Sequence, residues 1–238
     1  MEFEDEAIVL GARNHGETGA IVHLLTREHG VYATHIAGGA SRRIKPLLQA
    51  GSNVLVTYRA RHSDQLGSAT LEATGGHLDL LDEPLGLLGL QTACAMTQLV
   101  LPEREAHSGA FYGLSALLTA FAMPEIWPAI YVRYEAGLLE ELGFGLDLSA
   151  CAVTGVTTDL THVSPKTGRA VSREPAKPYC DRLLRLPQFL IGDAEATVAD
   201  LADAFRLTGH FLHMHVWDAR QVEPPSIRDA LVEALTAG

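Results

Sequence analysis

Short apolar segments, some of them alternating with polar residues, dominate the first 75 residues of the chain. They are rich in Val, Ile, Leu and Thr, and turn residues such as Gly38-Gly39 and Gly75-Gly76 separate them. Segments of this kind, bounded by glycine, are typical of β-strands. We predict strands over residues 7–10, 20–26, 31–36, 53–59 and 68–73. Short strands at this density favour a small closed barrel.

The fourth of these segments shows which side chains would face the inside of the barrel. Successive side chains of a strand point to opposite faces, so Val54, Val56 and Tyr58 share one face, whereas Arg59 lies on the other. The pattern predicts an apolar interior and an arginine-bearing exterior.

Beyond residue 82 the apolar positions recur with helical spacing. Pro84 is suited to a first helical turn, Ser108 can cap a second helix, and Gly143 can end a third. We expect helices over about 84–101, 108–121, 128–142, 197–217 (interrupted near Gly209) and 227–235. Residues 148–182 show no clear period. The sequence therefore predicts an α+β protein with a barrel domain at 1–79 and a helical domain at 80–238, with an irregular insertion at about 148–182.

The composition is that of a folded protein with a substantial core. Apolar residues make up 47% of the chain and charged residues 20%, which is an ordinary balance. No apolar run reaches the length of a membrane span, and the acidic start of the chain lacks the order of a signal peptide. Three cysteines do not suggest a disulfide framework. This sparse set fits a reducing cytoplasm, so we expect a cytoplasmic protein.

The charge is negative overall but unevenly distributed. The formal net charge is −11, yet residues 41–62 carry five basic residues and no acidic one. Phosphates are natural partners for such a segment, although a solvated strand-and-loop surface has the same composition. The candidate DNA-binding residues of the barrel are Arg13, Arg42, Arg43, Lys45, Arg59 and Arg61.

A second basic segment lies between residues 151 and 190, which hold six basic and three acidic residues. It would form an additional DNA contact or a docking surface for a partner. The alternative is a loop kept soluble by its charge. Its candidate residues are Lys166, Arg169, Arg173 and Lys177.

No pattern for catalysis or nucleotide binding occurs in the chain. The phosphate-binding loop, the dinucleotide-binding glycine motif and the nucleophile elbow are all missing. Cys94 lies in an apolar helical segment and is expected in the core. His210 and His213 share a helical face but His215 points elsewhere, so no metal site is expected there. We predict a protein without catalytic residues.

Several segments, in the same order along the chain, resemble the RecO family of recombination mediators, and the alphaproteobacterial branch in particular. The resemblance covers nearly the full length. It rests on Ala7-Ile8-Val9-Leu10, Gly16-Glu17-Thr18, Leu24-Leu25-Thr26-Arg27-Glu28-His29-Gly30, Ala37-Gly38-Gly39-Ala40-Ser41-Arg42-Arg43, Leu48-Gln49-Ala50-Gly51, the segment from Arg133 to Leu148, Cys151-Ala152-Val153-Thr154-Gly155, Val163-Ser164-Pro165-Lys166-Thr167-Gly168 and Tyr179.

The resemblance implies an N-terminal OB-fold barrel followed by a helical domain with a zinc-finger-like insertion. It implies binding of single- and double-stranded DNA and annealing of complementary strands. The implied partners are RecR and the acidic C-terminal tail of single-stranded DNA-binding protein, which together help load RecA onto coated strands. An arginine at the place of Arg133 would help to receive that tail. A non-enzymatic adaptor whose barrel contacts proteins rather than DNA remains the alternative.

The resemblance also raises the question of zinc. Many RecO proteins have two Cys-x-x-Cys pairs in the insertion, the spacing of a tetrahedral site. Here only Cys151 matches, Thr154 occupies the second position, and Ser172 falls near the third. A single thiolate cannot hold a structural zinc ion, so we expect no cofactor and a metal-free fold of the insertion.

Overall fold

The computed structural model describes residues 1–62, 65–75 and 83–237, and the chain forms two compact units. The first comprises Met1–Ala122 and the second Met123–Gly238. The domain boundary predicted between residues 79 and 80 lies outside the described residues. The predicted α+β class is confirmed, because a strand-rich region comes first and a helical one follows.

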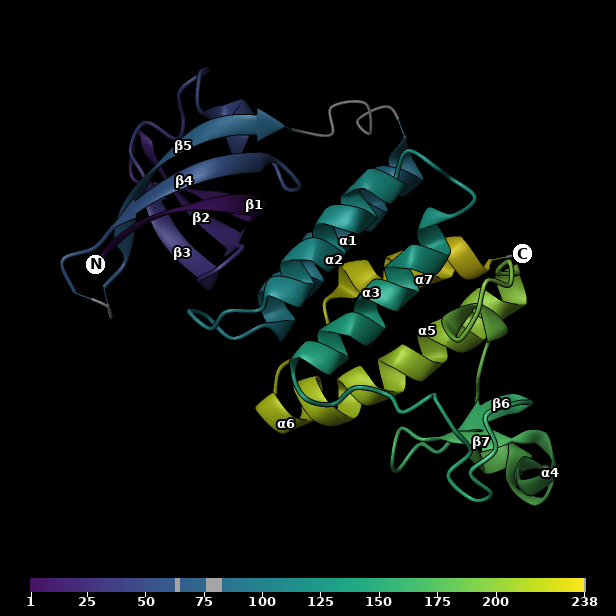
Figure 1. The fold of residues 1–238 in the computed structure, drawn as a ribbon. Helices are drawn as coiled ribbons and strands as arrows, with labels where there is room; N and C mark the ends of the chain where they lie inside the picture. Colours follow the sequence, from purple (N-terminus) through teal and green to yellow (C-terminus); the bar gives the residue numbers. More distant parts are fainter. Residues whose placement is uncertain (63–64, 76–82, 238) are drawn as a thin grey trace. The chain divides into compact units, whose positions relative to one another are not determined.

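The five strands of the first unit close into a barrel with the order β1-β2-β3-β5-β4 (Figure 1). The long strand β1 pairs with β4 through its first half and with β2 through its second half, both antiparallel. A short parallel pairing between β3 and β5 closes the barrel. The strands are β1 (Glu2–His15), β2 (Gly19–Thr26), β3 (Gly30–Ile36), β4 (Asn53–Arg59) and β5 (Gly67–Gly75).

The start of β1 differs from the prediction, which placed it at residue 7. The acidic residues before Ala7 belong to the strand. Asp5 is buried, and it accepts a hydrogen bond from the backbone N–H of Glu28 and contacts His29 Nδ1 at 3.0 Å. A buried carboxylate satisfied in this way can occupy a strand interior. The acidic residues therefore prevented the sequence pattern from predicting the first part of the strand.

The predicted two faces of β4 are confirmed. Val54, Val56 and Tyr58 are buried in the barrel core, and Arg59 is exposed. The loop after β3 contains a short 3-10 helix, η1 (Lys45–Leu48), and its Leu48 joins the same core.

Two helices, α1 (Pro84–Val100) and α2 (Ser108–Ala120), belong to the same compact unit as the barrel. The thiol of Cys94 on α1 contacts the carbonyl of Val9, 3.8 Å away. The loop between the helices is also attached to the barrel, since the N–H of Arg104 donates to Val31 at 2.8 Å. The predicted Ser108 cap is wrong: the cap residue is His107, and its side chain makes no capping bond.

The second unit is built on helices α3 (Trp127–Glu141), α5 (Val198–Leu212) and α7 (Ser226–Thr236). Thr197 caps α5 through a capping box with Asp200. The predicted interruption at Gly209 is wrong, because α5 continues through it. The glycine instead leaves room for the guanidinium of Arg228, which a Cβ there would meet at 3.3 Å. A π-helical turn, η5 (His213–Trp217), and the short α6 (Asp218–Arg220) follow α5.

The insertion predicted to be irregular forms a small sheet of order β7-β6-β8. Its elements are too short to show a period in the sequence. They are β6 (Leu160–Val163), β7 (Ala170–Ser172), α4 (Arg173–Ala176), η3 (Lys177–Arg182), β8 (Leu184–Arg185) and η4 (Gln188–Leu190). Strand β8 packs against α5, and Figure 1 shows β6, β7 and α4 near the first turns of that helix.

Candidate nucleic-acid interface

The predicted basic residues of the barrel fall into two groups at different places. Arg13 lies near the end of β1, and the loop after β3 carries Arg42, Arg43 and Lys45. This loop is attached to the turn between β1 and β2, because the N–H of Ala40 donates to Thr18 at 3.1 Å. We call these residues the hairpin-end cluster: Arg13, Arg42, Arg43 and Lys45.

Arg59 and Arg61 belong to the other group. Arg59 is paired in register with Glu2 at the start of β1, eleven positions before Arg13. Around the closed barrel, however, the register row of Arg13 continues through Ile21, His35 and Ser68 to Arg59, which is four strand spacings of about 4.8 Å each. Three strands, β2, β3 and β5, therefore lie between Arg13 and Arg59 in this row.

Ion pairing also distinguishes the two groups. The Nε of Arg59 lies 2.7 Å from Glu2 Oε1, so this guanidinium already has a carboxylate partner. Among the described residues, neither Arg61 nor any member of the hairpin-end cluster forms an ion pair, and all of them are exposed. These five cations keep their charge available for phosphate.

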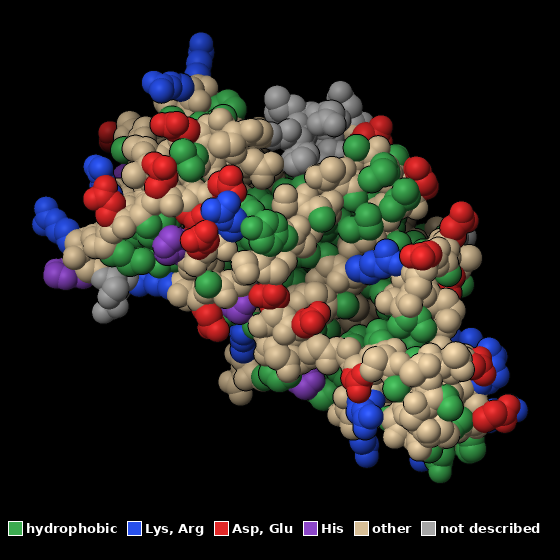
Figure 2. Space-filling view, viewed as in Figure 1, with side chains coloured by type: hydrophobic (Ala, Val, Ile, Leu, Met, Phe, Trp, Pro, Cys, Tyr) green, Lys and Arg blue, Asp and Glu red, His purple; other side chains and the backbone are tan. Residues whose placement is uncertain are grey.

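The second basic segment is largely neutralised by neighbouring acids. Arg169 lies 3.3 Å from Asp147, Arg173 lies 3.0 Å from Asp159, and Lys177 lies 2.6 Å from Glu174. Among its four predicted residues only Lys166 lacks an ion pair with a described acid. Figure 2 agrees with this mixture, since at the lower right, over β6, β7 and α4, Lys and Arg side chains stand beside Asp and Glu side chains.

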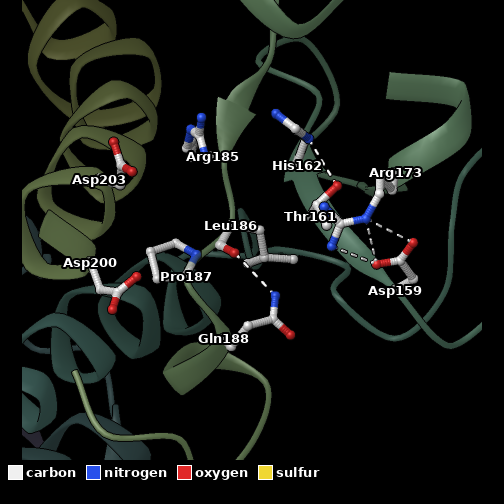
Figure 3. A pocket seen from close by; sticks show the side chains of 10 residues that line it. All are labelled: Asp159, Thr161, His162, Arg173, Arg185, Leu186, Pro187, Gln188, Asp200 and Asp203. Atoms are coloured by element: carbon white, nitrogen blue, oxygen red, sulfur yellow. Dashed lines mark hydrogen bonds and ion pairs between the residues drawn. The ribbon is translucent and has the colours of Figure 1, made fainter. Parts of the chain in front are cut away.

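Beside this segment lies a pocket of about 390 Å³, which the sequence did not predict (Figure 3). Asp200 and Asp203 line it from α5, and Arg185 and His162 line it from the small sheet. Burial, and then the nearby Arg185 and Arg173, lower the pKa of His162. The imidazole therefore adds no charge near neutral pH, and the facing carboxylates make this pocket unsuitable for a polyanion.

The remaining candidate groups do not converge on a site. His210 Nε2 contacts the carbonyl of Pro165 at 2.9 Å, His213 stacks edge-on against Trp217, and the ring of His215 stacks on Phe144. Burial raises the pKa of Cys94 to about 12, so this thiol is unreactive. The described part of the chain contains no cluster of His, Cys, Asp and Glu that could hold a metal ion.

Comparison with known proteins covers nearly the whole chain. Residues 1–74 match the family model "Recombination protein O N terminal", and residues 82–221 match "Recombination protein O C terminal". The chain belongs to the RecO family. Membership places it in DNA repair and recombination.

Individual RecO proteins are similar to this chain over nearly their full length. The "DNA repair protein RecO" of Phenylobacterium zucineum is 55% identical over 99% of this chain and 98% of its own. That of Caulobacter vibrioides NA1000 is 56% identical over the same shares. That of Rhodospirillum centenum is 47% identical over 98% of this chain and 94% of its own. No helix within the described ranges is long and apolar enough to cross a membrane.

Arg133, the residue that the RecO resemblance assigned to partner docking, borders a pocket of about 660 Å³. The pocket lies between α3 and residues 189–196, and Ile126, Ile130 and Phe189 supply apolar surface. The Nη2 of Arg133 donates to the carbonyls of Phe189 and Gly192. Three carboxylates, from Glu125, Asp193 and Glu195, also line the pocket.

The position at which other RecO proteins would hold zinc contains a hydrogen-bonded thiol. Cys151 Sγ accepts hydrogen bonds from the N–H and the hydroxyl of Ser172, both at 3.3 Å, and also from Thr154. Burial opposes ionisation of the thiol, but these bonds outweigh it and lower the pKa of Cys151 to about 6. The hydroxyls that replace cysteines are weak zinc ligands, so this set of donors does not fit a structural zinc ion.

Proposed function

We propose that this chain is a non-enzymatic DNA-binding recombination mediator. It would bind single- and double-stranded DNA, anneal complementary strands, and help RecR to load RecA onto strands coated with single-stranded DNA-binding protein. It would act in the cytoplasm, at the nucleoid, without a metal cofactor. The observation that carries this proposal is the unpaired hairpin-end cluster on a closed five-stranded barrel.

The strand order of the barrel supports its assignment as an OB fold. OB folds are five-stranded barrels that bind oligonucleotides on the face of strands 2 and 3 and with the loops that join strands 1–2 and 4–5. Here Arg42 and Arg43 follow a segment bonded to the β1–β2 turn, and Arg61 lies in the β4–β5 loop. The free cations therefore lie at or beside the loops that this class of barrel uses.

Electrostatic contact with phosphates would supply most of the affinity. Each phosphate contact on a single strand contributes a salt slope of about −0.7, so five contacts give roughly −3.5. The net charge of −11 works against binding and makes it weak at physiological salt. The repulsion between the negatively charged chain and DNA also explains why partner proteins would be needed to bring the chain to DNA.

The test is fluorescence anisotropy of a labelled single-stranded oligonucleotide, titrated with the protein at about 50 and 200 mM salt. We expect binding that weakens steeply between the two salt concentrations. Replacing Arg42, Arg43 and Lys45 together by alanine should abolish most of it. A matched control replaces Arg169, Arg173 and Lys177, which removes the same formal charge from residues that are already paired.

The outcomes separate the mediator from the adaptor. Equal losses in the triple variant and its control would mean that only net charge matters and that the cluster is not a site. Absence of binding at the lower salt concentration would favour the adaptor, which reaches DNA through RecR or single-stranded DNA-binding protein.

A further inference from the structure

The aromatic side chains inside the barrel are not accessible to nucleobases. Tyr32 and Tyr58 are 4% and 1% exposed, and they pack against each other and against Phe3 in the core. Proteins that bind single strands usually combine a cationic groove with rings on which the bases stack. If this barrel uses ring contacts, they come from other side chains.

Two histidines present their rings on the outer surface of the barrel. His15 ends β1, and His35 lies on β3. Their ring centroids are 5.8 Å apart and the rings are nearly perpendicular. His15 is exposed and His35 is partly exposed. Neither imidazole ring forms a hydrogen bond or an ion pair with a described side chain.

A glycine makes this arrangement of rings possible. Gly19 pairs with His15 across the β1–β2 hairpin, and a Cβ at Gly19 would lie 2.4 Å from His35 Nε2. The missing side chain leaves the space that the His35 ring occupies. The two rings can therefore lie side by side at one place on the surface.

The ring pair shares its face of the sheet with a cation. Arg13 pairs with Ile21, and Ile21 pairs with His35, so these three side chains lie in one row on one face. His15 is two residues after Arg13 and points the same way. The loop bearing Arg42 is bonded to Thr18 in the hairpin turn beside them. Rings and unpaired cations thus occur at the same end of the barrel.

We propose that His15 and His35 are a nucleobase-contact site for single-stranded DNA. The hairpin-end cluster would hold the phosphates, and an unstacked base would pack against the imidazole rings, as bases do on aromatic side chains. This proposal rests on the proposed DNA binding. It adds the side chains that would contact the bases of a single strand as well as its phosphates.

The test compares two labelled strands of equal length, an oligothymidylate and an abasic strand that has the phosphates but no bases. It is done with the full chain at about pH 8, where an ordinary histidine is neutral. We expect the natural protein to prefer the oligothymidylate by on the order of tenfold. His15→Ala with His35→Ala should remove this preference and leave binding of the abasic strand unchanged. His15→Phe with His35→Phe should retain it, and the control His213→Ala, a histidine of the second unit, should have no effect.

Each result has a distinct meaning. A preference that survives the double alanine variant, or equal binding of both strands by the natural protein, would overturn the proposal while leaving DNA binding itself intact. Equal weakening of both strands in the double alanine variant, with a shallower salt slope, would show that the histidines contact phosphate and would overturn ring contact. Binding of neither strand would overturn the DNA-binding function and this proposal with it.

Discussion

Single side chains of the same type differ in how much charge they can offer a partner. Arg59 and Arg42 are both exposed arginines of the barrel, but Arg59 is bonded to Glu2 whereas Arg42 forms no ion pair with a described carboxylate. Exposed ion pairs contribute only about 0–1 kcal/mol to stability. Their main consequence here is that they reduce the number of cations available to DNA.

The first prediction at this scale concerns Arg133. If the pocket beside it receives the acidic tail of single-stranded DNA-binding protein, Arg133→Ala should weaken binding of a tail peptide by about 1–3 kcal/mol. Asp193→Asn should strengthen it, because one of the three carboxylates that repel the tail is removed. Isothermal titration with the peptide measures both. If the two substitutions leave the affinity unchanged, the tail binds elsewhere.

The second prediction concerns the Cys151 thiol. The pKa of this thiol is lower in the folded than in the unfolded chain, so its ionisation stabilises the fold. The stabilisation is complete when the pH exceeds the ordinary thiol pKa, and it is lost as pH falls through about 6. The melting temperature of the second unit should therefore rise between about pH 6 and pH 9 by more than in Cys151→Ala. Thermal scans by circular dichroism at several pH values test it. Parallel curves for the two proteins would show that the thiol stays neutral.

At the scale of elements, a buried ion pair connects three helices of the second unit. Glu135 on α3 accepts hydrogen bonds from Arg228 on α7 at 2.7 and 2.9 Å, and Thr208 on α5 donates to the same carboxylate at 2.6 Å. The guanidinium also lies over the rings of Phe205 and Trp217. Because both charges are removed from water, each depends on the other.

This dependence leads to a prediction. Arg228→Met alone should destabilise the chain by about 3–5 kcal/mol, because it leaves Glu135 charged and buried. Glu135→Leu combined with Arg228→Met should cost less than either change alone. Urea unfolding measures the difference, and Arg206→Met, which breaks only an exposed pair with Asp203, is the matched control. Additive losses in the double variant would rule out the coupling.

The elements were predictable where a local pattern defines them, and less so where distant residues do. The alternation around Tyr58 identified β4 and its buried face, and the apolar spacing after Pro84 identified α1. The first part of β1 was missed because Asp5 is satisfied by residues 23 and 24 positions away. The neutralisation of Arg59 by Glu2 depends on strand register, which the sequence alone does not reveal.

At the scale of the whole molecule, the barrel is not a separate body from the first two helices. Leu90 on α1 fills the space beside Gly51, and the loop after α1 approaches Gly30 so closely that a Cβ there would lie 1.7 Å from the Glu105 carbonyl. Removal of α1 would expose apolar residues of β1 and β2 that this helix helps to bury.

We therefore expect two fragments to behave differently. A fragment of residues 1–122 should unfold in one cooperative thermal transition and stay monomeric. A fragment of residues 1–79 should aggregate or melt at a lower temperature, because its exposed apolar surface has no partner. Size-exclusion chromatography and calorimetry on both fragments test this. Equal stability would show that the helices add nothing to the barrel.

The positions of the two tryptophans give the chain a built-in optical label. Trp127 begins α3 and Trp217 ends the π-helical turn, so both indoles are in the second unit, whereas the first unit absorbs in the near ultraviolet through tyrosine and phenylalanine alone. Both indole rings are buried. Light that excites only tryptophan will therefore report the unfolding of the second unit, and a change in the far-ultraviolet signal without a change in tryptophan emission will report the first unit in the same sample.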